Sequence, residues 1–488
     1  MSGARTDAVI VGAGPNGLAA ALTLARAGFR VTVLEAADEP GGGTRSFADP
    51  VVDGLLHDHC AAVHPFGIGS PYLRTLPLDR YGLEWLQPDV ACAHPLDDGT
   101  AALLHQDLDE TVAGLGADGE WWRRLFAAPS QHFDALAASI LGPLVRVPRH
   151  PLVLARNGLL SLAPATVTAA RFADGLEGPG AALFAGVAAH AVAPLDSPGT
   201  TGVATMLIAA GHARGWPVAR GGSQSIWRAM VAMLEELGGE VVTGVRVRSM
   251  RDLPRARVAL FDTDPGQLAD ILGDAADARE QRRLRGWQHA TAGAFKVDLA
   301  VRGGVPWTAE GARRAGTLHL GGTFTEIADA EASSSGGRMP QRPYVLVSQP
   351  AVADPSRRVG DIEPVWAYAH VPAEAPAGPG APDPELARDA ILAQLERFAP
   401  GLADRIVATH VTTPADFAAG NANLVGGDIT GGALTLRQLV ARPRFGPDPY
   451  ATAVPGAFLC SASTAPGAGV HGMCGHHAAR SALRVLTR

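Results

Sequence analysis

The chain has 488 residues, of which 47% are hydrophobic and 18% are charged, so it is long enough for two or three globular domains and too apolar to be disordered. A net charge of -7 and a 6% aromatic content argue against a nucleic-acid-binding protein. Four cysteines without a C-x-x-C pair give no pattern for a redox disulfide or a zinc site.

No apolar run is long enough to cross a bilayer, and a strand is expected from residue 7, which leaves no room for a signal peptide. We therefore expect a cytoplasmic protein, with loose contact to a membrane surface left open.

The first 35 residues carry the strongest pattern. Residues 7–11 are a short apolar run typical of a buried parallel strand, and the turn Gly12-Ala13-Gly14-Pro15-Asn16-Gly17 follows at once. Apolar residues then recur at helical spacing up to Gly28, and the apolar strand 30–34 ends at Glu35. A strand, a G-x-G-x-x-G turn, a helix, a strand and an acid in this order predict dinucleotide binding.

Each glycine of that motif has a physical role here. Gly12 allows the tight turn, Gly14 lets the backbone approach a pyrophosphate, and Gly17 lets the helix pack on the strand. The helix N-terminus would face the phosphates, and Glu35 would accept hydrogen bonds from an adenosine ribose. A glycine turn without a nucleotide is the alternative, and the flanking elements disfavour it.

The loop that follows distinguishes between the cofactors. Gly41-Gly42-Gly43 comes shortly after Glu35 and is followed by Thr44 and Arg45. An acid followed by a diglycine resembles the flavoprotein form of the motif, in which this loop lies along the FAD diphosphate and the flavin. The resemblance favours FAD over NAD.

Residues 46–64 lead away from this first segment. They contain His57, Asp58, His59 and Cys60, which are residue types that ligate metals. We interpret them as a polar loop beside the flavin and expect no metal.

Residues 65–215 have a different character, with apolar helical periodicity, punctuating prolines and few strands. We interpret them as a helical cap over a substrate cavity; a helical core without a cavity is the alternative. A helix over 224–237 and strands at 240–242, 245–247 and 258–261 then resemble nucleotide-domain material again.

Residues 286–411 contain four segments that are predicted to be strands, at 295–301, 317–320, 344–349 and 365–370. Residues 328–340 are predicted to be a polar Ser/Gly-rich loop, 373–384 a linker and 385–398 an amphipathic helix. These elements predict a mixed sheet that completes the cavity.

The C-terminal segment has the same order of elements as the first segment: a strand, a glycine-rich loop and a helix. A buried strand ends at Cys460-Ser461, and the glycine-rich loop 466–475 leads into a helix over 476–486. Its backbone N–H groups around Val470 to Met473 would stabilise negative charge on a reduced flavin.

The predicted fold class is α/β, with a discontinuous Rossmann-like FAD-binding domain, a mixed-sheet substrate domain and a helical cap. The FAD-binding domain would comprise 1–64, 216–285 and 412–488, and the substrate domain 65–215 and 286–411.

Together these motifs resemble the amine-oxidase and phytoene-desaturase superfamily of FAD oxidoreductases, with greatest similarity to phytoene-desaturase-like proteins related to retinol saturase. The resemblance implies that Gly12, Gly14, Pro15, Asn16 and Gly17 line the diphosphate. It also implies cofactor contacts for Glu35, Gly42, Gly43, Arg45, Val247, Ser461, Gly469, Val470, His471 and Met473. The chain departs from the family where Gly43-Thr44 displace Arg45 from the diglycine and where Ser461 stands in place of a frequent aspartate.

Two residues are candidates for catalysis. Lys296 is the one lysine of the chain and precedes Pro306-Trp307, as does a lysine that reaches flavin N5 through water in amine oxidases of this superfamily. An ion pair with Asp298 is the structural alternative. His471 could carry a proton beside the flavin or be a hydrogen-bonded structural histidine.

The expected function is that of an FAD-dependent oxidoreductase of desaturase or dehydrogenase type, which takes hydride from an apolar, lipid-like small molecule to flavin N5. Quinone, oxygen or NAD(P) would accept the electrons, and no nucleic acid partner is expected. Two alternatives stay open: a flavin-dependent isomerase or saturase of a polyene, and a flavin-binding scaffold without turnover.

Overall fold

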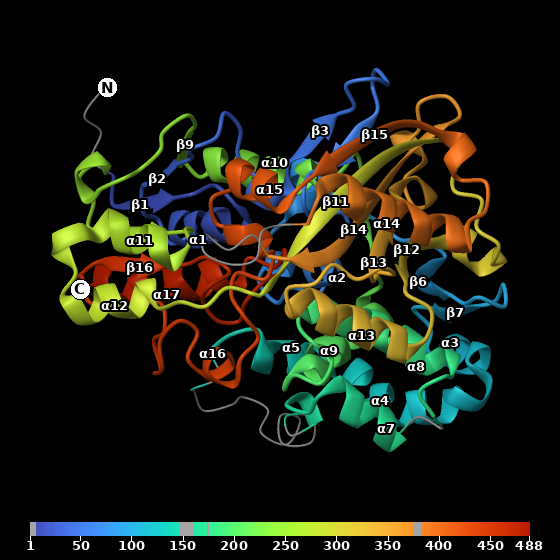
Figure 1. Cartoon of the computed structure of the whole chain (residues 1–488). Coiled ribbons are helices and arrows are strands. Elements are labelled where there is room, and N and C mark those ends of the chain that lie inside the picture. The colour runs from blue at the N-terminus through green and yellow to red at the C-terminus, as the bar shows by residue number, and fades with distance from the viewer. Residues whose placement is uncertain (1–5, 144, 146–157, 159, 173–174, 374–381) are drawn as a thin grey trace.

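A five-stranded parallel sheet forms one half of the molecule (Figure 1). The computed structural model describes residues 6–143, 145, 158, 160–172, 175–373 and 382–488. The strands of this sheet lie in the order β16 (Ala457–Leu459), β10 (Val258–Phe261), β1 (Ala8–Val11), β2 (Val31–Leu34) and β9 (Glu240–Val242). Every neighbouring pair is parallel, so three segments far apart in the sequence build one sheet, as the predicted fold class requires.

The helices α1 (Pro15–Ala25) and α17 (Met473–Leu486) pack closely beside this sheet. A Cβ on Gly475 would lie only 1.7 Å from the carbonyl oxygen of Asn16, so the two helix N-termini meet where only glycine fits. The contact brings the first and last glycine loops to the same edge of the sheet.

A seven-stranded mixed sheet forms the other half of the molecule. Its strand order is β15 (Ile406–Thr412), β11 (Ala292–Arg302), β14 (Ile362–Pro372), β13 (Val345–Ser348), β12 (Ala315–Leu320), β6 (Val90–Pro95) and β7 (Ala101–Leu104). Only the β12–β6 pair is parallel among these strands. The sheet includes all four strands predicted from 286–411, together with β6 and β7 from a segment expected to hold few strands.

Helices gather beneath this sheet in Figure 1. They are α3 (Leu108–Gly114), α4 (Gly119–Gln131), α5 (Phe133–Ile140), α7 (Ala165–Phe172), α8 (Pro179–Ala188) and α9 (Thr200–Arg214). Trp122, Phe126 and Phe184 are buried between α4, α8 and α9, and their aromatic area stabilises the layer. In the described part of the chain, no helix is long and apolar enough to span a bilayer.

The prediction of a loop at 328–340 was wrong, because helix α13 (Phe324–Ser335) occupies most of this range. Thr323 and Glu326 form a reciprocal capping box that starts the helix, and Ile327 is fully buried. Ser334 donates a hydrogen bond to the His370 carbonyl at 2.7 Å, so a residue type typical of loops is used here inside a packed helix.

Two short hairpins complete the fold. One pairs β3 (Ser46–Ala48) with β4 (Leu56–Asp58), and its tip lies beside β15 (Figure 1). The other pairs β5 (Trp85–Leu86) with β8 (Val218–Ala219). Most of the predicted linker 373–384 lies outside the described residues, and the helix predicted after it is α14 (Pro384–Phe398).

Candidate functional site

The turn between β1 and α1 has the geometry that a dinucleotide needs. Gly12 adopts a φ of +99°, and a Cβ on Gly17 would lie 2.0 Å from the Gly12 carbonyl oxygen. Pro15 starts α1, where a missing N–H costs nothing. The turn lines a cavity of about 980 Å³ that continues from the parallel sheet to the seven-stranded sheet.

Glu35 lies at the end of β2 and borders the same cavity. Its Oε2 accepts a hydrogen bond from the Ala13 N–H at 2.7 Å, and its Oε1 accepts one from the Ala37 N–H at 2.9 Å. The carboxylate is therefore held at the carboxyl edge of the sheet, where an adenosine ribose would be recognised.

The loop after Glu35 lies against the glycine turn. The Gly41 N–H donates to the Ala13 carbonyl at 2.9 Å, and a Cβ on Gly42 would be 3.2 Å from the Gly14 Cα. Arg45 Nε and Nη2 donate to the carbonyls of Gly42 and Gly420. Gly42, Gly43 and Arg45 line the cavity, and the hydrogen bonds of Arg45 give it a role in shaping the loop.

Val247 also lines the cavity, on an extended segment that follows β9 without joining the sheet. The predicted strand at 245–247 is therefore absent from the described sheets, although the Val245 N–H donates to the Glu35 carbonyl at 2.8 Å. This hydrogen bond fixes the segment beside Glu35.

Asp262 is a site residue that the sequence reasoning missed. It follows β10 directly, and its Oδ2 accepts a hydrogen bond from the Gly17 N–H at 2.8 Å. A Cβ on Gly14 would lie 2.8 Å from the same oxygen, and burial raises the pKa of Asp262 to about 7. Its position just after a buried strand was the available signal, because parallel strands place their carboxyl ends at one edge.

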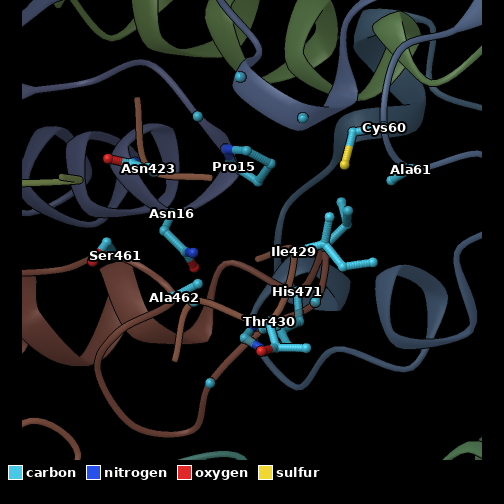
Figure 2. A pocket seen from close by; sticks show the side chains of 18 of the residues that line it. Pro15, Asn16, Cys60, Ala61, Asn423, Ile429, Thr430, Ser461, Ala462 and His471 are labelled. Carbon is cyan, nitrogen blue, oxygen red and sulfur yellow. The ribbon is translucent and has the colours of Figure 1, made fainter. Parts of the chain in front are cut away.

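The C-terminal segment forms the opposite wall. Figure 2 shows Asn16 between the turn and residues Ser461 and Ala462, with Thr430 and His471 farther along the wall. Gly469 and Val470 also line this wall, whereas Met473 is buried and is not among the lining residues.

His471 has a structural hydrogen bond. Its Nδ1 accepts from the Met473 N–H at 3.0 Å, which caps the N-terminus of α17, while its Nε2 has no hydrogen-bond partner among the described residues. Burial lowers the pKa of His471 to about 4, so the imidazole is neutral near pH 7. The Met473 N–H therefore donates its hydrogen bond to His471, whereas the sequence predicted that it would stabilise the flavin.

Lys296 is fully buried on β11 behind the cavity wall. Its Nζ lies 2.7 Å from Asp298 Oδ2 and donates to the Asp58 carbonyl at 2.8 Å. It also lies 5.9 Å from the ring of Trp366, which does line the cavity, while Lys296 itself does not. These contacts support the ion-pair alternative; a water-mediated contact with a flavin stays a prediction.

The far end of the cavity is largely apolar and also contains the imidazole of His190. Its walls come from both the helical layer and the seven-stranded sheet: Ile140, Leu141, Met206, Leu207, Trp216, Leu346, Trp366 and Tyr368. His190 also lines it, and its Nε2 lies 2.9 Å from the Nε2 of buried His319. Burial lowers the pKa of His190 to about 3, so this imidazole is neutral near pH 7.

The residues present fit FAD. Within the described part of the chain, the buried Asn16 Oδ1 has no hydrogen-bond partner, and Asn16 borders the cavity, so a polar ligand atom would satisfy it. Because Gly14 and Gly42 approach each other closely and carry no side chains, their backbone atoms would face a diphosphate directly. Glycine turns, a held carboxylate and two helix N-termini at one edge define a dinucleotide-binding oxidoreductase of the Rossmann type.

Comparison with known proteins agrees with this geometry. Residues 10–76 match the family described as an NAD(P)-binding Rossmann-like domain. The chain is 27% identical to the hydroxyneurosporene desaturase of Rhodobacter capsulatus, over 98% of each chain. It is 24% identical to a lycopene-forming phytoene desaturase of a Paracoccus species, over 97% of this chain and 96% of that one.

Among solved structures, a putrescine oxidase bound to putrescine has a TM-score of 0.61 at 19% identity, over 99% of this chain and all of the other. That likeness shows a shared fold. The chain is thus an FAD-dependent oxidoreductase that is similar to these carotenoid desaturases over nearly its whole length.

Proposed function

We propose that the protein oxidises an elongated apolar molecule, such as a polyene, by removing hydride from a C–H bond. The observation that carries this proposal is the continuity of one cavity from the glycine turn to an apolar chamber. A ligand in the chamber would meet aromatic and aliphatic side chains, which recognise hydrocarbon through area rather than charge. The two desaturase relatives named above support a polyene as the substrate class.

FAD, when bound, supplies the hydride acceptor at its flavin ring. The protein's own residues would hold the cofactor: Glu35 would bind the ribose, and the backbone of Gly12 to Gly14 would face the diphosphate. The N-terminus of α17 would place the positive end of a helix dipole toward the flavin wall.

The chamber walls would exclude water and orient the substrate. Trp216, Trp366 and Tyr368 are almost fully buried, so their ring faces can hold a planar molecule in one position. Neutral His190 and the Tyr368 hydroxyl would provide hydrogen-bonding groups at this end of the cavity. Formation of a double bond removes a hydride and, from the neighbouring carbon, a proton. The walls would set which C–H bond loses hydride, and the neutral imidazole of His190 would accept the proton and release it to water.

We further propose that the substrate enters from a lipid surface. Leu162 and Val440 border the cavity and are 48% and 45% exposed. Leu436 and Phe445, near Val440 in the sequence, are 55% and 67% exposed. Exposed large apolar side chains at a cavity mouth fit a membrane contact and the passage of a water-insoluble molecule.

The experiment that tests the function is anaerobic titration of the purified flavoprotein with a panel of polyenes, lipids and amines, followed by visible absorption. Bleaching of the flavin band by an acyclic polyene is the expected result. Reoxidation with a quinone, oxygen or NAD(P)⁺ would then identify the electron acceptor.

Two results would overturn the proposal. Turnover that requires pre-reduced flavin and consumes no electrons would establish an isomerase instead. A flavoprotein that no compound on the panel bleaches, and that converts none of them when reduced, would favour a scaffold.

A further inference from the structure

A second cluster of chemistry-bearing side chains lies outside the cavity, where the β3–β4 hairpin meets the edge strand β15. Asp49 follows β3, His57 is on β4 and His410 is on β15. Asp49 Oδ2 is 2.9 Å from His57 Nε2 and 3.0 Å from His410 Nε2. One ligand atom from each residue lies within 4.8 Å of the other two, and none of the three residues lines the cavity.

The carboxylate of this cluster is preorganised. Asp49 Oδ1 accepts hydrogen bonds from the N–H groups of Val51 and Val52, both at 2.8 Å, which leaves Oδ2 directed at the two imidazoles. The side chains of Asp49 and His57 are fully buried, whereas that of His410 is 21% exposed. The site is thus closed on the protein side and open to water on one side.

The second ring nitrogen of His57, Nδ1, is not satisfied by the hydrogen bonds of the cluster. When His57 Nε2–H donates to Asp49, its Nδ1 presents a lone pair, and none of the residues that the structure describes forms a hydrogen bond with this buried atom. It lies 3.8 Å from Asp298 Oδ1, so two acceptors face each other. With the proton on Nδ1, the imidazole would donate toward Asp298, and the Nε2 lone pair would be free for a metal.

The local charges favour a cation at this point. Asp298 is already paired with Lys296 at 2.7 Å. In the described part of the chain, the ion-pair partners of Asp49 are the two histidines alone. A divalent ion between the three ligand atoms would neutralise Asp49 and replace the two hydrogen bonds with coordination bonds.

We propose that Asp49, His57 and His410 bind one zinc-type divalent ion, with water as the remaining ligand. Two imidazoles and one carboxylate suit Zn²⁺ and its borderline neighbours, and suit Ca²⁺ and Mg²⁺ poorly because those ions prefer oxygen ligands. The ion would fasten the β3–β4 hairpin to the exposed edge of the seven-stranded sheet. The site is independent of the proposed oxidation and differs from the expectation of no metal that the cysteine pattern gave.

The test is calorimetric titration of chelator-treated protein, with its flavin retained, by Zn²⁺. We expect one equivalent to bind with submicromolar affinity and the melting temperature to rise. His410→Gln is the matched variant, because a glutamine amide can still donate to Asp49 but lacks the imidazole ligand. It should bind Zn²⁺ at least 100-fold more weakly while retaining its flavin.

His132→Ala, which removes an exposed histidine elsewhere, should bind Zn²⁺ as the wild type does. Absence of stoichiometric Zn²⁺ binding in the wild type would overturn the proposal and leave the cluster as a hydrogen-bonded one. Equal affinity in the wild type and His410→Gln would overturn it as well, because the ion would then be bound elsewhere.

Discussion

Asp262 places an ionisable group directly beneath the turn that faces the FAD diphosphate. Its carboxyl accepts a hydrogen bond from Gly17, yet burial raises its pKa to about 7 from an unfolded value near 3.8. The folded state therefore binds the proton more tightly than the unfolded state. This contribution to stability is fully present below pH 3.8 and is lost as pH rises through about 7.

For Asp262 we predict a pH-dependent cofactor affinity. Above pH 7 the ionised carboxylate would repel the diphosphate, so FAD affinity should fall about tenfold between pH 6 and pH 8.5. Asp262→Asn keeps an acceptor for the Gly17 N–H and should remove this dependence. Fluorescence titration with FAD at both pH values measures it, and parallel pH profiles for the two proteins would contradict it.

For Lys296 we predict a structural role. Lys296→Met would leave Asp298 buried without its cation, and such losses cost about 3–5 kcal/mol of unfolding free energy. Urea unfolding measures this cost, and adding Asp298→Asn to the same chain should restore much of it. Unchanged stability together with slowed flavin reduction or reoxidation would instead establish the flavin-site role.

At the scale of elements, α17 depends on a side chain from the loop before it. His471 accepts the Met473 N–H at the helix start, where Gly472 itself offers no side chain. The same loop forms the flavin wall, so the capping hydrogen bond joins helix stability to the geometry of the site.

His471 variants can separate capping from proton transfer. His471→Ala should lower the free energy of unfolding by about 1 kcal/mol, and His471→Asn should recover it, since an asparagine oxygen also caps. Because a pKa of about 4 keeps His471 neutral, we expect the flavin of the His471→Asn variant to be reduced by substrate at nearly the wild-type rate. Chemical unfolding and rapid-mixing absorption provide the two readouts; a ~100-fold slower reduction would identify a proton carrier.

At the scale of the whole molecule, exposed apolar side chains border the cavity at Leu162 and Val440, and lipid binding is the predicted consequence. The double variant Leu436→Glu/Phe445→Glu should co-sediment with anionic lipid vesicles at least tenfold less than the wild type, because burying charge at the interface is costly. Val51→Glu, on the β3–β4 hairpin, is the control and should bind as before. Equal sedimentation of all three proteins would rule out this surface.

Much of the architecture could be predicted because its signals are local. The turn 12–17 and the alternating strands of the seven-stranded sheet each depend on residues close in sequence. The capped helix α13 was missed because serines and glycines suggested a loop, while its buried face depends on distant strands.

The site was predictable only in part. Glu35 and the glycine loops follow a motif, and the structure places them at one cavity. Asp262 and His190 reach that cavity because separate segments fold together; Asp262 has only its position after a buried strand as a signal, and no motif marks His190. The Asp49–His57–His410 cluster has the same origin, since β15 brings His410 to the hairpin.

The meeting of α1 and α17 at Gly475 has a consequence for how the protein is made. The elements β1 and α1 are synthesised before α17, yet the flavin wall is built from the loop before α17. Until α17 has been made, β10 lacks one of the helices that pack on it. A nascent chain stalled before residue 457 should therefore be held by chaperones and retain no flavin, and the yellow colour would mark chains in which α17 has been made.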